Sequence, residues 1–217
     1  MPVVPLTERM GIDFWEVVDA AKTKPFGFMP FYPGPGVGGH CIPIDPYYLS
    51  WKAREYDFYA EFIELAGEVN QAMTHHVVEL TRRGLSRHGK PLSGARVLVL
   101  GVAFKRDIDD ARNSPAERII ELLLNGGAQA TYHDPYVSSF RVGGNVFHRE
   151  PVTLESVDLT EDVLAAADCV IIVTDHLSVD YERVVKLAKL IVDTRNTTAS
   201  VPGYEEKIVR LGAPLSR

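Results

Sequence analysis

The sequence predicts an α/β protein in which a helical first part is followed by a parallel sheet covered by helices. Apolar residues recur at steps of three or four along 58–80, the period of an amphipathic helix. From residue 94 onward, short β-branched runs alternate with helical segments, which is typical of a parallel sheet buried on both faces. The pattern changes at 90–94, so we expect a helical domain over 1–92 and a Rossmann-like sheet domain over 93–217.

The composition is that of an ordinary globular protein. The 217 residues include 23 Lys+Arg and 29 Asp+Glu, a formal net charge of −6, and 46% are hydrophobic. This acidic balance argues against a nucleic-acid partner, because phosphate binding needs a basic face. The longest apolar run, 97–104, is too short to span a bilayer, and no signal peptide is visible. Two cysteines cannot form a disulfide framework, so we expect a cytoplasmic protein without a membrane partner.

Two helices are expected in the first part. Asp13 and Glu16 stand at capping-box spacing and predict a helix that begins at Phe14. From Phe58 to Gly89 an apolar stripe predicts one long helix of about 30 residues, roughly 45 Å. The stripe consists of Phe62, Leu65, Val69, Met73, Val77 and Leu80. A helix of that length must bury its stripe against another surface, and a partner subunit is one candidate.

The second part contains four apolar or β-branched runs and three helical segments. The runs, which we expect to be strands, are 96–100, 129–132, 169–174 and 190–193. The expected helices are 115–125, 160–167 and 181–189. Segment 138–152 is polar and rich in turn residues, and we expect an irregular excursion there.

A loop rich in glycine and proline, 31–46, is the densest feature of the sequence. Gly34, Gly36 and Gly39 match G-x-G-x-x-G, but a dinucleotide fingerprint needs a strand before it and a helix at its third glycine. Prolines on both sides argue against that interpretation. The glycines instead allow backbone amides to approach an anionic or hydroxylated ligand, and a plain surface turn is the alternative.

Cys41 follows this loop and is a candidate nucleophile. Backbone N–H groups before it and a helix opening after it would lower the pKa of its thiol. A lone cysteine more often packs in a core, and Cys169, inside an apolar run, is expected to do so. Asp45 lies four residues after Cys41, and Asp45 with Pro46 has the form of an N-cap followed by proline at the first helical position. Such a carboxylate can cap a helix and still face the thiol.

The histidines give no metal site. His40 beside Cys41 suggests a Cys–His pair or a metal ligand, but adjacent residues on extended backbone point apart. No second Cys/His pair has ligand spacing, so we predict no metal. His75 and His76, on the long helix, are expected to be solvated.

The connection between the first strand and its helix is unusually long. Ser114, Pro115 and Glu117 mark the helix start, which leaves about thirteen residues where about 2–6 are usual. Long loops at the carboxyl ends of parallel strands are where open sheets bind ligands. Within this loop Lys105 suits a phosphate, and Phe104 suits a base or a sugar face.

Three other residues follow strands of the predicted sheet. Arg195 lies beyond the carboxyl end of the strand 190–193 and is expected to face the same crevice. Asp134 and Asp175 end two other strands, where a single aspartate more often caps a helix or turn.

Three segments together resemble the UDP-glucose/GDP-mannose dehydrogenase family, whose members oxidise nucleotide sugars to uronic acids. Residues 38–45 are similar to its nucleophile motif. Residues 100–105 with 109–115 are similar to the signature of its UDP-binding domain, and 192–196 to its closing arginine motif. The resemblance covers the whole chain, and it is closest to the bacterial branch acting on UDP-glucose or UDP-N-acetylhexosamines.

The resemblance implies a mechanism and a set of roles. NAD would take a hydride from the C6 alcohol, Cys41 would form a thiohemiacetal and then a thioester, and Asp45 would help water to hydrolyse it. Arg112 would reach NAD across a domain interface, and the long helix would join two subunits in a homodimer. The residues implied to hold the UDP-sugar are Tyr32, Gly34, Gly36, Val37, Gly38, Phe104, Lys105 and Arg195.

The chain also departs from the family pattern. Members begin with a Rossmann NAD domain, followed by a helix that supplies a catalytic Lys and Asn, and neither segment is present in this sequence. We therefore expect the central helical domain to be incomplete at its N-terminus, NAD to be bound mainly by the absent domain, and the isolated chain to be inactive. Ile44 stands where glucose-type enzymes carry a lysine, which argues against UDP-glucose as the substrate.

Two alternatives of other classes stay open. A non-catalytic UDP-sugar-binding module would bind UDP, but Cys41 would be neither quickly alkylated nor protected by UDP-sugar. An unrelated thioester-forming hydrolase or aldehyde oxidiser built on Cys41 would show no dependence on UDP.

Overall fold

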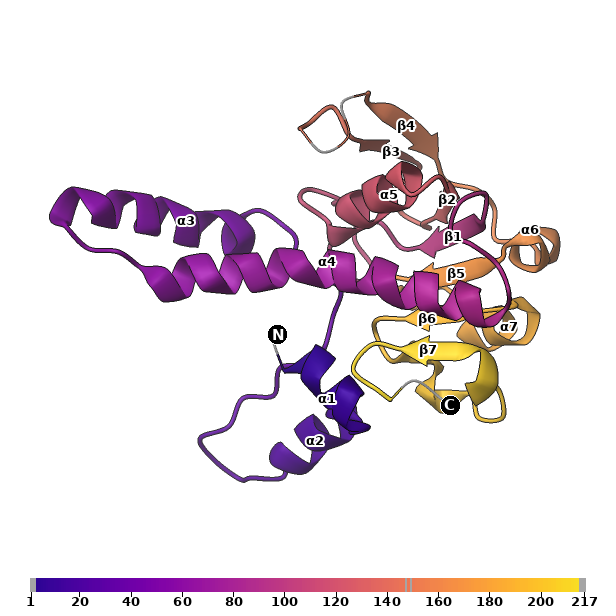
Figure 1. Ribbon diagram of the computed structural model, residues 1–217, viewed down its shortest axis with the longest axis horizontal. Helices are drawn as coiled ribbons and strands as arrows, with labels where there is room; N and C mark the ends of the chain where they lie inside the picture. The colour runs from indigo at the N-terminus through magenta and orange to yellow at the C-terminus, as the bar shows by residue number, and fades with distance from the viewer. Residues whose placement is uncertain (1–2, 147, 149, 215–217) are drawn as a thin grey trace.

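The computed structural model describes residues 3–146, 148 and 150–214, and its centre is a sheet of five strands in the order β2-β1-β5-β6-β7 (Figure 1). All neighbouring strands of this sheet are parallel, which confirms the predicted fold class. The strands are β1 Arg96–Leu100, β2 Gln129–His133, β5 Cys169–Ile172, β6 Ile191–Asp193 and β7 Ile208–Arg210. The edge strand β7 is an addition to the predicted set.

Seven α-helices and three short 3₁₀ turns accompany the described sheet. The helices are α1 Val4–Met10, α2 Phe14–Ala21, α3 Cys41–Ala53, α4 Glu61–Arg87, α5 Pro115–Asn125, α6 Glu161–Ala166 and α7 Tyr181–Leu187, and the turns are η1 Arg54–Tyr56, η2 Thr197–Ser200 and η3 Glu205–Lys207. Two predicted caps are confirmed: the side chain of Asp13 accepts from Trp15 N at 2.9 Å, and that of Ser114 accepts from Ala116 N at 3.2 Å. Among the described residues, no helix combines the length and the apolar character needed to cross a bilayer.

Each face of the sheet is covered by a pair of helices. Val97, Val99 and Cys169 belong to the core cluster that includes α4 and α5. The alternate residues Leu98 and Leu100 belong to the cluster that includes α6 and α7. Successive strand residues therefore supply two cores, which explains why the strands are almost continuously apolar.

Helix α4 has two unlike halves. Its buried residues, which cover the sheet, are Met73, Thr74, Val77, Leu80, Thr81, Gly84 and Leu85. Its first half extends away from the sheet with α3 beside it (Figure 1). There Phe62 is 88% exposed and Leu65 is also exposed. Met73, Val77 and Leu80 of the predicted stripe are thus buried within the chain, Val69 is partly buried, and Phe62 and Leu65 are exposed.

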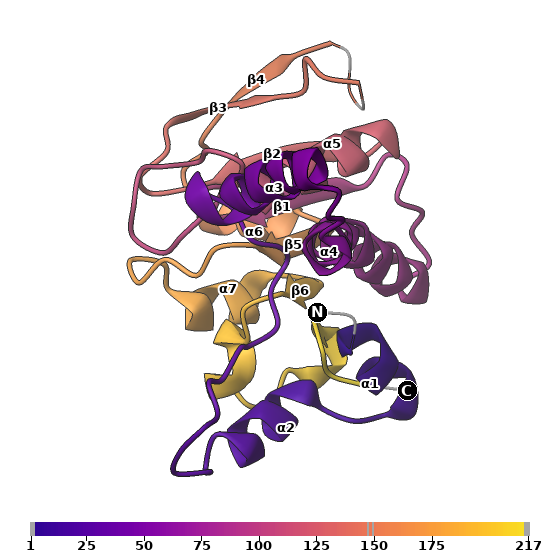
Figure 2. The ribbon, with the colours of Figure 1, turned by 90° about the vertical axis from the view of Figure 1, so that its left-hand side faces the viewer.

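The first two helices attach to the far end of the chain (Figure 2). Trp15 Nε1 donates to Leu211 O at 2.7 Å, and Arg210 pairs with Asp13 at 2.6 Å beside the last strand. Helix α1 also contacts α4, because His76 Nε2 lies 2.8 Å from a Glu8 carboxylate oxygen. The prediction that His76 is solvated is therefore wrong.

The predicted irregular excursion at 138–152 is instead a β-hairpin. Strands β3 (Ser139–Val142) and β4 (Val152–Glu155) pair antiparallel. Phe140 and Val142 are buried in the α5 side of the core, while their neighbours in β3 are exposed. This alternation extends over only four residues, too few to stand out among the polar residues around it. Residues 147 and 149 of the segment lie outside the described residues.

Candidate functional site

The glycine-rich loop is hydrogen-bonded on both sides. From α4, the Asn70 side chain accepts from Val37 N at 2.8 Å and donates to Val37 O at 3.4 Å. From the long loop after β1, Arg112 O accepts from Gly39 N at 2.9 Å, and Asn113 Nδ2 donates to Gly39 O at 3.0 Å. The two loops singled out by the sequence therefore lie in direct contact.

Two of the glycines are required by this contact. A Cβ atom at Gly38 would lie 2.7 Å from Phe104 Cβ and 2.8 Å from Asn113 O, both too close. Gly39 adopts φ +92°, and its Cβ would lie 3.0 Å from the Phe104 ring. The Phe104 side chain thus packs closely against both glycines, and a larger residue at either position would displace it.

Cys41 is exposed and is the first residue of α3. His40 has helical backbone angles (φ −99°, ψ −55°), and its Nδ1 lies 4.0 Å from Cys41 Sγ. The prediction that these side chains point apart is wrong, because it assumed an extended backbone. Among the described residues, no cluster of His, Cys, Asp and Glu could hold a metal ion.

Asp45 lies inside α3 and does not cap it, so its predicted N-cap role is wrong. The helix begins four residues earlier, at Cys41, and continues through Pro46. Residues four apart on a helix share a face, so the Cys41 thiol and the exposed Asp45 carboxylate are neighbours on one surface. The Asp45 carboxylate can therefore face the thiol without capping the helix.

Arg112 supplies a positive charge beside this surface. Its guanidinium is 67% exposed and pairs with Asp110 at 2.6 Å. Hydrogen bonds from the Arg112 side chain and backbone lower the pKa of the Asp110 carboxyl to about 2. The pair with Asp110 raises the pKa of Arg112, and the charge of Cys41 adds to that shift. The backbone of Arg112 is also bonded to Gly39, two residues before Cys41, so Arg112 lies beside the loop that leads to the thiol.

A second group of charges lies at the carboxyl ends of β5 and β6. Asp175 is buried, and its carboxylate pairs with Arg106 and, at 3.0 Å, with Arg195 Nε. Burial alone would raise the pKa of Asp175, but the two arginines lower it overall. Arg195 Nη1 also lies 3.2 Å from the position of a Cβ on Gly34. The crevice predicted to receive Arg195 thus also borders the glycine loop.

The remaining predicted ligand contacts fall in two places. Lys105 is exposed and forms no ion pair with the described residues. Tyr32 packs against α2: its ring stacks on Trp15 at 5.5 Å, and its hydroxyl donates to Asp19 at 2.9 Å and accepts from Lys22 at 2.9 Å. Tyr32 therefore anchors the start of the loop to α2.

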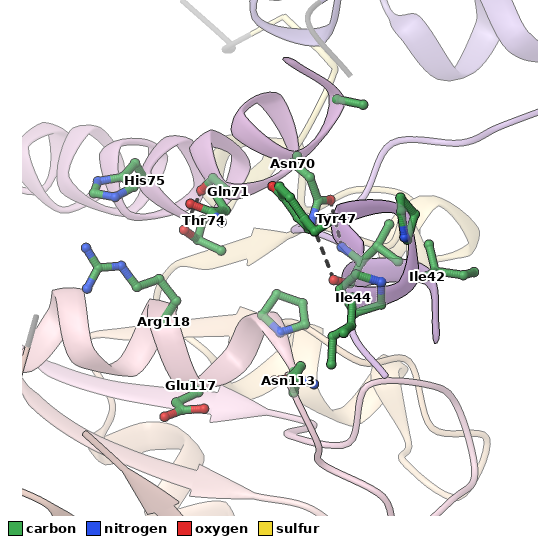
Figure 3. Close-up of a pocket in the computed structure, with 18 of the residues that line it drawn as sticks. Ile42, Ile44, Tyr47, Asn70, Gln71, Thr74, His75, Asn113, Glu117 and Arg118 are labelled. Carbon is green, nitrogen blue, oxygen red and sulfur yellow. Dashed lines mark hydrogen bonds between the residues drawn. The ribbon is translucent and has the colours of Figure 1, made fainter. Parts of the chain in front are cut away.

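A cavity of about 870 Å³ lies between α3, α4 and the start of α5 (Figure 3). Asn70, Thr74 and His75 of α4 face Glu117 and Arg118 of α5 across it (Figure 3). Burial and the nearby Glu121 carboxylate raise the pKa of Glu117. Of the predicted site residues in the described chain, Gly36 and Val37 line this cavity, so most of the predicted site lies outside it.

Sequence reasoning missed three residues that organise the site: Asn70, Asn113 and Asp175. Asn70 is a polar residue on a helix, and no pattern distinguishes it from a solvated one. Asn113 has φ +50°, a left-handed conformation that asparagine tolerates in turns. The place of Asp175 at the end of a strand is a signal for a site residue. Its pairing with two arginines could not be predicted, because they lie far from it in the sequence.

Models of one protein family match most of the chain. The model described as "UDP-glucose/GDP-mannose dehydrogenase family, UDP binding domain" matches residues 98–200. The model of the central domain of the same family matches residues 3–72. The first match contains β2, β5, β6 and most of β1, and the second contains α1, α2, the glycine loop, α3 and the first part of α4.

Individual relatives agree with these matches. A UDP-N-acetyl-D-mannosamine dehydrogenase of Pyrococcus horikoshii is 34% identical over 202 residues, which cover 91% of this chain and 44% of that protein. A UDP-N-acetyl-D-glucosamine 6-dehydrogenase of Pseudomonas aeruginosa is 40% identical over 131 residues, 60% of this chain and 31% of that protein. The chain thus spans less than half the length of these relatives.

A solved structure has the same fold. The structure of a UDP-D-ManNAc dehydrogenase from Pyrococcus horikoshii superposes with a TM-score of 0.80 at 29% sequence identity. The superposition covers 99% of this chain and 48% of that one. The arrangement of helical part and sheet is therefore shared over essentially the whole described chain.

Proposed function

The chain belongs to the UDP-glucose/GDP-mannose dehydrogenase family, and from that premise we propose that it carries the nucleophile and the UDP site of an NAD-dependent nucleotide-sugar 6-dehydrogenase. The reaction is the four-electron oxidation of the C6 alcohol of a UDP-sugar to the uronic acid. UDP-N-acetylhexosamines are the favoured substrates, since the relatives in Pyrococcus horikoshii and Pseudomonas aeruginosa are named for them. Ile44, in place of a lysine, is consistent with that choice.

One observation carries the proposal: the loop before Cys41 is hydrogen-bonded to the loop that contains Phe104 and Lys105. Gly39 forms two hydrogen bonds, one with Arg112 O and one with Asn113 Nδ2. Phe104 packs against the same glycines. A nucleotide sugar bound along the second loop would therefore present its sugar close to the thiol.

Cys41 and Asp45 perform the covalent steps in this proposal. After the first hydride and a proton leave the alcohol, the Cys41 thiolate adds to the C6 aldehyde and forms a thiohemiacetal. The adduct formed by the thiolate is an alkoxide, and loss of the second hydride from this alkoxide gives a thioester. Asp45, one helical turn away, accepts a proton from the attacking water, the C–S bond breaks, and the acid and the free thiolate are released.

NAD supplies the acceptor of both hydrides when it is bound. Arg112 would contact it, because its side chain is 67% exposed and its backbone is hydrogen-bonded to Gly39, two residues before Cys41. Gly34, Gly36 and Gly39 do not fit a dinucleotide site, since no strand precedes them among the described residues and Gly39 is packed against Phe104. NAD would therefore be held mainly by other parts of the enzyme.

The UDP moiety belongs at the carboxyl edge of the sheet. Lys105 provides an exposed ammonium group without an ion-pair partner in the described chain. Arg195 provides a guanidinium that Asp175 orients at 3.0 Å. Two cations beside a half-buried Phe104 ring match the charge of a diphosphate and the face of a base.

We also place a homodimer interface on the outward half of α4. Phe62 and Leu65 are exposed there, and aromatic residues of the neighbouring α3 extend the apolar surface. The large apolar residues of α3 that are exposed are Ile42, Tyr47, Tyr48, Leu49 and Trp51. An apolar surface of this kind favours a protein partner. We further propose a cytoplasmic location, where thiols such as those of Cys41 and Cys169 stay reduced.

Calorimetric titration with UDP tests the proposed site. Lys105→Ala and Arg195→Ala should each weaken binding about tenfold or more, because each removes a cation from the diphosphate. Lys189→Ala is the matched control, since Lys189 lies 3.9 Å from Asp168 at the start of β5. Failure of the wild-type chain to bind UDP would contradict the proposal and favour an unrelated thioester-forming enzyme. The non-catalytic alternative predicts the same UDP binding with an unreactive Cys41.

A further inference from the structure

The part of the long loop that contains Lys105, residues 104–106, is fixed at both of its ends. At its start, Asp134 Oδ2 accepts from Val102 N at 2.7 Å and from Ala103 N at 3.0 Å. At its end, Asp107 N donates to His176 Nδ1 at 3.0 Å. Residues 104–106, which carry Lys105, lie between these two attachments.

The two attachments are joined by one imidazole. His176 is fully buried, and its Nε2 lies 3.1 Å from Asp134 Oδ2. Because Nδ1 accepts from a backbone N–H, it carries no proton, so Nε2 is the donor to the carboxylate. His176 is therefore a neutral bridge that accepts on one side and donates on the other.

The surroundings of Asp134 make this bridge rigid. Burial would raise the pKa of Asp134, but hydrogen bonds from His176 and from backbone amides, including that of Ala103, lower it to about 2. Asp134 Oδ1 additionally accepts from Tyr136 N at 2.9 Å. The carboxylate stays charged and fully bonded, which gives the imidazole a fixed partner.

The far end of the loop is also tied to the segment after β5. Asp107 Oδ1 accepts from Leu177 N at 2.9 Å, and Arg106 pairs with Asp175. Asp175 in turn pairs with Arg195. His176 is thus bonded to the segment that carries Lys105 and follows Asp175, which orients Arg195, in the sequence.

We propose that His176 is a positioning residue of the UDP site: it fixes the loop that carries Lys105 by joining the backbone of Asp107 to the Asp134 carboxylate. The inference rests on the proposed function for the identity of the ligand. His176 contributes no contact of its own to UDP, because its ring is fully buried and both nitrogens are engaged within the chain.

The ¹⁵N resonances of the His176 ring in the wild-type chain test the bridge without any variant. We expect protonated Nε2 and unprotonated Nδ1 at neutral pH. A ring protonated at Nδ1 could not accept from Asp107 N and would overturn the inference.

Two substitutions separate the two bonds of the imidazole. In His176→Gln the amide reaches the position of Nε2 and keeps the bond to Asp134, whereas in His176→Asn it replaces Nδ1 and keeps an acceptor for Asp107 N. Amide exchange at residue 107 should become about tenfold faster or more in His176→Gln and stay slow in His176→Asn. The amides of 102 and 103 serve as controls. Equal exchange at 107 in wild type and His176→Gln would overturn the inference, and a variant that fails to fold leaves the ring resonances as the test.

Calorimetry with UDP then tests the consequence for binding. His176→Gln should weaken UDP binding about fivefold or more in the wild-type background and less than about twofold in Lys105→Ala, because it acts through Lys105. Full additivity of the two substitutions would overturn the positioning role. Absence of UDP binding in the wild-type chain would instead contradict the proposed function, while the ring resonances and the amide exchange would still decide the bridge.

Discussion

Cys41 and Cys169 are the same residue in opposite surroundings. Cys41 is exposed at the start of a helix, with His40 Nδ1 4.0 Å from its sulfur. Cys169 is 0% exposed inside β5, and burial raises the pKa of its thiol far above the usual range. The comparison shows that the loop before Cys41, and not the thiol itself, makes one of them a candidate for chemistry.

The two neighbourhoods are also stabilised differently. Around Cys169 the contacts are apolar and come from strands and from α4 and α5. The segment before Cys41 is fixed mainly by hydrogen bonds between its backbone and the residues Asn70, Asn113 and Arg112. Substitutions near Cys169 should therefore change stability, and substitutions near Cys41 should change geometry and reactivity.

The largest expected difference is in the rate of alkylation. In the native chain, iodoacetamide should modify Cys41 at least about 10³-fold faster than Cys169, because Cys169 reacts only after local or global unfolding. Peptide mass spectrometry over a time course measures both rates in one sample. In urea the two rates should become similar. Comparable alkylation rates of the two cysteines in the native chain would contradict the difference in their surroundings.

The next effect concerns the free energy of unfolding. Cys169→Ser should lower it by about 3 kcal/mol, because a hydroxyl replaces a thiol in an apolar core. Cys41→Ser, the matched change at an exposed site, should alter it by less than about 0.5 kcal/mol. Urea denaturation of both variants measures the difference. A larger loss for Cys41→Ser would show that Cys41 has a structural role.

A smaller effect is expected in the glycine loop. Gly38→Ala should lower the free energy of unfolding by about 2 kcal/mol, since the added methyl would lie 2.7 Å from Phe104 Cβ and 2.8 Å from Asn113 O. Gly34→Ala is the control, because its methyl meets only Arg195 Nη1, the end of a flexible side chain, at 3.2 Å. Urea denaturation gives the stabilities, and the alkylation rate of Cys41 should change in Gly38→Ala alone. Equal behaviour of both variants would contradict the proposed contact between the loops.

Much of the fold could be predicted because the pattern was long or repeated. The helix Pro115–Asn125 was predicted with its exact bounds, since Ser114, Pro115 and Glu117 form a complete start signal. Strand β7 and the β3–β4 hairpin were missed because each strand has only three or four residues and no independent pattern. Helix α3 was expected to open at Asp45, because an Asp-Pro pair resembles a cap, but the helix accommodates that proline internally.

The individual segments of the site could be predicted from the sequence, but the hydrogen bonds that join them could not. The glycine loop, Cys41 and the long loop with Lys105 each had a local signal. Their contact depends on Asn70 and Asn113, which are 33 and 74 residues away from the groups they bind. Long-range hydrogen bonds of this kind leave no period in a sequence, so the structure was needed to find them. The joint action of the Cys41 thiol and the Lys105 and Arg195 cations on one UDP-sugar stays a prediction.

Protection of Cys41 by substrate tests the central claim most directly. The chain is treated with iodoacetamide with and without UDP-N-acetylglucosamine, and the modification of each cysteine is followed by mass spectrometry, with urea-denatured chain as the reference for Cys169. We predict that the UDP-sugar slows alkylation of Cys41 about tenfold or more and that Lys105→Ala abolishes this protection. Alkylation of Cys41 at the same rate with and without saturating UDP-sugar would contradict the claim that this thiol faces the bound sugar.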